Sequence, residues 1–143
     1  MSYYTTIRCK CVVKQGFREL IGQVVDEVSN GKELHLEDKY LKEVLSDGSR
    51  FRLFFYDKNK WYEKIKEEEI AYSYNATSGE WHFHVAINRE DGEIEEFLVR
   101  FKPIFLEEIE LLEIYDENAV EQYLEGRRDS YLITDFITYW IEN

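Results

Sequence analysis

The chain has 143 residues and a formal net charge of −12 at pH 7, and its 44% hydrophobic content suits a single globular domain spanning residues 1–143. Aromatic residues make up 16% of the chain, which has only seven glycines and one proline, so a disordered or low-complexity protein is excluded. No apolar run approaches the roughly 20 residues that cross a bilayer, and the first residues lack a secretion signal, so we expect a cytoplasmic protein that binds no membrane.

The negative charge is concentrated in the C-terminal part of the chain. Residues 1–60 hold nine acidic and eleven basic residues, whereas residues 61–143 hold 21 acidic and seven basic residues. No basic residue lies between Lys102 and Arg127. A field of this sign repels phosphate, so we expect no direct binding to nucleic acid and no docking on an anionic membrane surface. The expected partner is a basic protein surface.

The N-terminal part of the sequence predicts a strand followed by a helix. Residues 3–13 alternate between two faces, which is the two-residue period of a strand. One face carries Tyr3, Thr5, Ile7, Cys9, Cys11 and Val13. From Phe17 to Val28 the apolar residues recur at helical spacing, so an amphipathic helix is expected there, ending near Asn30 and Gly31.

The next residues predict three short elements. Leu34 and Leu36 flank His35 in an extended piece, and residues 40–45 suggest a brief helix. From Arg50 to Tyr56 the pattern alternates again, which predicts a strand followed by a polar turn. Residues 61–69 fit a helical turn or an exposed loop.

The clearest local pattern predicts an antiparallel meander over residues 70–102. Its three strands would be residues 70–75, 80–88 and 93–102, joined by two polar turns. The predicted core face carries Trp81, Phe83, Val85 and Ile87, with Phe97, Val99 and Phe101 from the third strand. The fold class expected for the whole chain is therefore α+β, an antiparallel β-sheet with helices packed on one face.

The C-terminal elements are harder to assign from their pattern. Residues 104–115 mix Ile, Leu and Glu in a way that suits a strand or a helix, and we predict an edge strand after Pro103. Asn118 is expected to cap a short helix that ends at Gly126. The spacing of the apolar residues in 132–141 predicts a terminal helix.

Two residue pairs have the ligand types of a zinc site, Cys9 with Cys11 and His82 with His84. The cysteines are predicted on the apolar face of their strand, whereas both histidines are predicted opposite Trp81. The pairs would therefore not converge, and we expect no bound metal. Phosphate-binding glycine loops and the common catalytic motifs are absent from the sequence, so no cofactor is expected.

His82 and His84 still define an alternative function. Two imidazoles on one strand face, with Tyr72 or Tyr74 across the hairpin, could act as acid and base or bind a metal together with a carboxylate. The alternative is thus a small metal-assisted or acid/base enzyme. Such a pair also occurs on an ordinary polar sheet surface, so a non-enzymatic protein is favoured.

The leading hypothesis is a small acidic binding protein that docks a basic partner, as an inhibitor, an immunity factor or a nucleic-acid mimic does. Glutamates at alternate strand positions lie roughly 6.6 Å apart and can present fixed charges to lysine and arginine. The candidate partner-binding residues are Glu107, Glu110, Glu113, Asp116, Glu117 and Glu121. A further alternative is that this acidic face only keeps the protein soluble. The sequence leaves the oligomeric state open.

Overall fold

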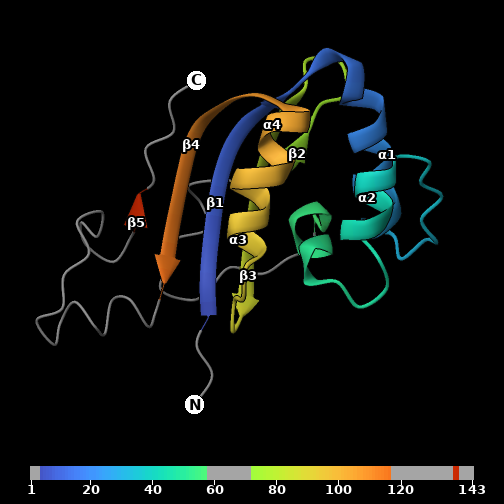
Figure 1. The fold of residues 1–143 in the computed structure, drawn as a ribbon. Helices are drawn as coiled ribbons and strands as arrows, with labels where there is room; N and C mark the ends of the chain where they lie inside the picture. Colours follow the sequence, from blue (N-terminus) through green and yellow to red (C-terminus); the bar gives the residue numbers. More distant parts are fainter. Residues whose placement is uncertain (1–3, 58–71, 117–136, 139–143) are drawn as a thin grey trace, which may run out of the picture.

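A computed structural model describes residues 4–57, 72–116 and 137–138 of the chain. These residues contain five strands in one antiparallel sheet, in the order β2-β3-β1-β4-β5 (Figure 1). The strands are β1 (Tyr4–Val13), β2 (Ser73–Tyr74), β3 (Glu80–Asn88), β4 (Leu106–Asp116) and β5 (Ile137–Thr138). The two long neighbours of β1 pair with it along almost its whole length, so β1 is the centre of the sheet.

The predicted N-terminal strand is confirmed over Tyr4–Val13, together with its buried face, whereas Tyr3 lies outside the described residues. Thr5, Ile7, Cys9, Cys11 and Val13 alternate along β1, and all five are buried. Their partners on β3 belong to the same face, since Cys9 is in register with Phe83 and Cys11 with Trp81. The alternation identified this strand because one of its faces packs on the core throughout.

The helices lie on one face of the sheet, so the predicted α+β class is confirmed (Figure 1). The described helical segments are η1 (Gln15–Phe17), α1 (Arg18–Ser29), α2 (Lys39–Val44), η2 (Arg50–Phe55), α3 (Glu93–Glu95), η4 (Glu96–Phe101) and α4 (Lys102–Phe105), where η1 and η2 are 3₁₀ helices and η4 is a π-helix. The predicted helices near residues 17–28 and 40–45 correspond to α1 and α2. None of the helices within the described ranges has the length and apolar character to cross a membrane.

The core between the sheet and the helices is mainly aromatic. On β3, Trp81 lies 5.3 Å from Phe55, and Phe83 lies 5.5 Å from both Phe54 and Phe97, measured between ring centroids. Trp81 and Phe83 are completely buried. These contacts join the central part of the sheet to η2 and η4, and large aromatic side chains bury much apolar area per residue.

The strand predicted over residues 50–56 is wrong, because Arg50–Phe55 forms the 3₁₀ helix η2. The Ser49 side chain caps its start by accepting a hydrogen bond from the backbone N–H of Phe51 at 3.2 Å. The residues that η2 buries are Phe51, Phe54 and Phe55, which follow helical spacing. In an alternating strand Phe54 would lie on the opposite face from Phe51 and Phe55, whereas all three are buried in the core.

The third strand of the predicted meander is also wrong, because residues 93–105 are helical. Gly92, with φ of +90°, turns the chain at the end of the preceding loop. Phe97 and Phe101 are buried as expected, but Val99 is 62% exposed. Only the first two strands of the meander remain, as the short β2 and the long β3.

The strand predicted over residues 104–115 is confirmed as β4, but it is not an edge strand, because β4 lies between β1 and β5. Its register explains why its pattern was ambiguous. Leu106 pairs with Val13 and Glu108 with Val12, so Glu107 is an extra residue without a partner on β1. The register shifts again between Ile109 and Leu111, leaving Glu110 as a second extra residue. Two β-bulges therefore interrupt β4. The buried residues Leu106, Ile109, Leu112 and Ile114 then follow neither a strand nor a helix period.

The terminal helix predicted over residues 132–141 is wrong at Ile137 and Thr138, which form β5. There Ile137 pairs with Ile114, and Thr138 pairs with Glu113. The other residues of that prediction, the helix expected after Asn118, and residues 61–69 lie outside the described residues.

Candidate functional site

The two bulges on β4 position the first two candidate acids, Glu107 and Glu110. Both residues are exposed, and neither has a partner in the ladder with β1. Glu107 lies 3.6 Å from Nη2 of Arg18, and its side chain is 62% exposed. Arg18 is held by its own bonds, since Nε donates to the Val13 oxygen at 2.9 Å and Nη1 to the Thr77 oxygen at 3.1 Å. The positive charge of Arg18 therefore offsets part of the negative charge of Glu107.

Glu110 has no ion pair within the described part of the chain. Basic residues further along the sheet do not face it in register, because a bulge residue has no cross-strand partner. Its carboxylate is thus the most open negative charge that the described candidates provide.

The structure brings the remaining candidates together only in part. Glu113 is in register with Arg8 on β1, and Asp116 is in register with Thr5 at the end of β4. Glu117 and Glu121 lie outside the described residues. The structure therefore describes side chains at Glu107 and Glu110, and only the backbone register at Glu113 and Asp116.

The outer face of the sheet, opposite the helices, carries basic residues at its centre. Arg8 stands between His84 on β3 and Glu113 on β4, and Lys10 stands between His82 and Leu111. Arg8 is buried and Lys10 half-buried. A basic central strand beside an acidic β4 lowers the net charge of this face, so the two bulge residues are the better candidates for contact with a basic partner.

His82 and His84 lie on this outer face as predicted, but His84 is buried, with only 8% of its surface exposed. Burial lowers the pKa of His84. Its ring centroid lies 6.5 Å from that of Tyr72, with the two rings nearly perpendicular. The Tyr72 hydroxyl accepts a hydrogen bond from Trp81 Nε1 at 3.0 Å and donates one to the Phe54 oxygen at 3.1 Å. The tyrosine that could assist the histidines is therefore already engaged in the core.

Among the concave sites of the described residues, one has a volume of about 640 Å³ and another a volume of about 310 Å³. Neither contains His82 or His84, so the enzyme alternative finds no support in their shape. The smaller is lined by Val44, Gly48, Ser49, Arg50, Phe51, Asp91, Gly92, Glu93 and Glu96. Its central pair is Arg50 with Glu93, at 2.9 Å between Nη2 and Oε1, and Arg50 also donates to the backbone oxygens of Asn88 and Arg89. These bonds hold the loop that precedes α3 in place.

The two cysteines lie on the opposite face from the histidines, so the predicted face assignment is confirmed. Cys9 and Cys11 are both buried and free, and the Cys11 thiol lies 3.7 Å from the Trp81 backbone oxygen. Burial raises the pKa of Cys9, with the neighbouring Cys11 as a smaller cause. In residues 4–57, 72–116 and 137–138, no three His, Cys, Asp or Glu residues are grouped so as to hold a metal ion. The cysteines act there as small apolar residues.

The sequence reasoning assigned no function to the larger concave site. This groove is lined by Glu33, Leu34, His35, Leu36, Glu37, Lys42, Leu45, Ser46, Asp47 and Arg52. The alternation over residues 33–37 was visible in the sequence, but the opposite wall comes from α2 and the residues after it. Only the tertiary structure brings these two walls together.

Comparison of the chain with protein-family models, with curated proteins and with solved structures finds no match. A functional argument for this protein therefore depends on its own residues. The open charges of β4 and the groove beside residues 33–37 are the two features that offer one.

Proposed function

We propose that this protein binds a basic protein partner through the acidic side of β4. The observation that carries the proposal is the position of Glu107 and Glu110, the exposed extra residues of two β-bulges. Further candidates along the same strand and beyond it are Glu113, Asp116, Glu117 and Glu121. A partner with lysine and arginine side chains would meet these carboxylates.

The bulges support recognition by side chains over recognition by the backbone. A bulge re-aims the side chain of its extra residue, and β4 is already paired with β1 along one edge and with β5 at Glu113 and Ile114 along the other. The exposed carboxylates of Glu107 and Glu110 are therefore the groups that β4 offers to a partner. The partner would then be selected by charge, and long-range attraction would mainly accelerate its association.

An inhibitor, an immunity factor against a toxic enzyme and a nucleic-acid mimic share this chemistry, and we place the protein in this group. The cytoplasm is its proposed location. Buried, free Cys9 and Cys11 agree with a reducing compartment, where structural disulfides are rare. The net charge of −12 makes direct binding to nucleic acid the poorer hypothesis.

The test begins with affinity capture from a native lysate at low salt, followed by association kinetics with the captured partner. The double variant Glu107→Gln and Glu110→Gln should slow association about three- to tenfold, because two steering charges are lost while the dissociation rate changes less. A matched control is Glu19→Gln with Glu43→Gln, since both of these acids are exposed on helices.

Circular dichroism would first verify that both double variants fold. Equal association rates for the wild type and the β4 variant would eliminate this strand as the docking site and favour a face that only serves solubility. Equal slowing by the β4 variant and the helix control would show that net charge, and no defined site, attracts the partner.

A further inference from the structure

Residues 33–37 alternate between exposed and half-buried side chains, as a strand does, but belong to no helix and no sheet. Leu34 and Leu36 are half-buried against the core, whereas Glu33, His35 and Glu37 are exposed, which is the alternation of an extended chain. None of the backbone N–H or C=O groups of these five residues forms a hydrogen bond within the described structure. All five residues line the groove of about 640 Å³, so the groove follows the whole segment.

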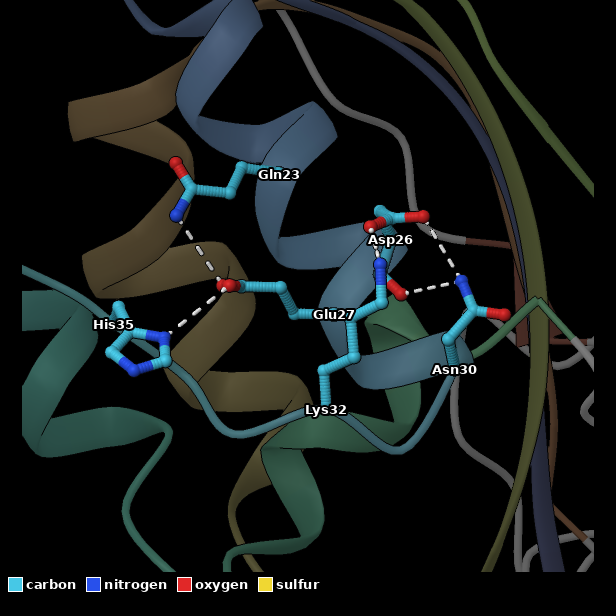
Figure 2. A network of polar contacts seen from close by, with 6 residues as sticks. All are labelled: Gln23, Asp26, Glu27, Asn30, Lys32 and His35. Atoms are coloured by element: carbon cyan, nitrogen blue, oxygen red, sulfur yellow. Dashed lines mark hydrogen bonds and ion pairs between the residues drawn. The ribbon is translucent and has the colours of Figure 1, made fainter.

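A polar network holds the N-terminal end of this segment against α1 (Figure 2). Lys32 Nζ lies 2.9 Å from the Asp26 carboxylate, and the backbone N–H of Lys32 donates to the Glu27 oxygen at 2.8 Å. The Asn30 amide donates to both Oδ1 and the backbone oxygen of Asp26 at 2.9 Å. His35 Nδ1 lies 3.8 Å from the Glu27 carboxylate. The network fixes where the segment starts.

The C-terminal end of the segment is also held. The Asp38 side chain accepts a hydrogen bond from the backbone N–H of Leu41 at 2.9 Å, which caps α2. Because both ends of residues 33–37 are anchored, a ligand that binds along them need not meet the full cost of ordering a loop.

The opposite wall of the groove has an apolar floor and few open charges. Leu45 is buried, and Arg52 crosses beside it, donating from Nε to the Leu45 oxygen at 2.8 Å and from Nη2 to Asp47 at 3.1 Å. The positive charge of Arg52 is therefore already paired. Glu33 and Glu37 have no ion pair among the described residues. The groove that they line also contains Lys42, whose charge, unlike that of Arg52, is not paired with Asp47.

We propose that this groove binds an extended, basic peptide segment of a partner protein, which pairs with residues 33–37 through main-chain hydrogen bonds. Residues directly opposite each other in an antiparallel pair share a face. Side chains opposite Leu34 and Leu36 would thus be aliphatic, and those opposite Glu33 and Glu37 would be lysine or arginine. The recognised pattern is basic, aliphatic, any residue, aliphatic, basic.

The site is independent of the acidic residues on β4, and its chemistry differs. The backbone of β4 is already paired with β1 and with β5, whereas residues 33–37 offer unpaired donors and acceptors. Backbone pairing would supply affinity in the groove, and the alternate pockets and the two terminal carboxylates would supply specificity.

The experiment is an NMR titration of the full chain with the capped peptide Lys-Leu-Ser-Leu-Lys, up to about 1 mM because so short a ligand binds weakly. Saturable shifts of the backbone amides should be confined to residues 33–37 and to the wall at Lys42, Leu45 and Arg52. A peptide with N-methylated backbone nitrogens should lose binding, and so should one with glutamate at both ends. Absence of saturable shifts, or unchanged binding of the N-methylated peptide, would overturn the proposal.

Matched variants separate the site from net charge. Glu33→Lys with Glu37→Lys should weaken peptide binding about tenfold or more, because attraction becomes repulsion at two positions. Glu19→Lys with Glu43→Lys makes the same change in net charge outside the groove and should have little effect. Glu107→Gln with Glu110→Gln should leave peptide binding unchanged, so failure here and failure of the β4 proposal are distinguishable. Equal weakening by the two lysine variants would overturn the site.

Discussion

Gly79 shows how one residue connects the β2–β3 turn to the rest of the fold. Its φ of +78° lies in the left-handed region, and its oxygen accepts a hydrogen bond from the Val13 N–H at 2.8 Å. A Cβ atom at this position would lie 2.6 Å from the Val13 oxygen and 2.5 Å from Arg18 Nε. The turn therefore packs against the end of β1 with no space for a side chain.

The substitution Gly79→Ala should lower the free energy of unfolding by about 2 kcal/mol or more, because backbone strain and a steric clash act together. Gly16→Ala is the matched control, since nothing lies within 4 Å of a Cβ there and its φ is not positive. Urea unfolding of both variants measures the difference. Similar free energies for the two variants would contradict the packing of this turn.

His84 should make stability depend on pH. Burial lowers its pKa in the folded protein, so the unfolded chain binds a proton more readily and stability falls as the pH drops through the ordinary histidine pKa of about 6.5. The free energy of unfolding should thus decrease less between about pH 7.5 and about pH 5.5 in His84→Gln than in the wild type.

His35→Gln is the control for this measurement, because the His35 side chain is 74% exposed. An identical pH dependence in His84→Gln and the wild type would contradict the burial of His84.

At the scale of elements, the sequence correctly predicted the helices and strands whose apolar residues follow a single period, either that of a strand or that of a helix. β1 and α1 each bury one continuous face, and both were predicted correctly. The aromatic runs at residues 50–56 and 93–102 fit a strand as well as a helix, since Phe97 and Phe101 are four residues apart and satisfy both periods. Packing of Phe54 on Phe83 and Phe97 selects the helical arrangement, and a pattern within one segment contains no information about such contacts.

The helical assignment of residues 93–105 predicts unequal effects at two neighbouring apolar positions. Phe97→Ala should cost about 3–5 kcal/mol, because Phe97 is buried and stacked on Phe54 and Phe101. Val99→Ala should change the free energy of unfolding by no more than about 0.5 kcal/mol, since this side chain is exposed. In a core-facing strand both substitutions would be costly, so two similar losses on urea unfolding would contradict the helix.

The candidate sites were predictable to the extent that they depend on residue type. The sequence identified the acids of residues 107–121. Only the register between β1 and β4 in the structure reveals that Glu107 and Glu110 are bulge residues and that Arg8 is in register with Glu113. The alternation of residues 33–37 was likewise readable. Their unpaired backbone and the opposite wall of the groove depend on the tertiary fold.

At the scale of the whole molecule, the net charge of −12 has opposite consequences for folding and for binding. Like charges held in a compact structure repel one another, so the acid excess destabilises the folded state. The same field attracts a basic partner from a distance. Dissolved salt screens both interactions, with a screening length of about 8 Å at physiological ionic strength.

Raising the salt concentration from about 10 mM to about 150 mM should therefore increase the midpoint temperature of unfolding while it slows association with a captured basic partner. Glu107→Gln with Glu110→Gln should reduce the salt dependence of association more than that of stability, because these two exposed acids form the proposed docking surface but are a small part of the total charge. Differential scanning fluorimetry and stopped-flow kinetics on the same samples measure the two effects. If salt slowed the association of the variant as strongly as that of the wild type, the steering charge would lie elsewhere on the molecule and the β4 proposal would fail.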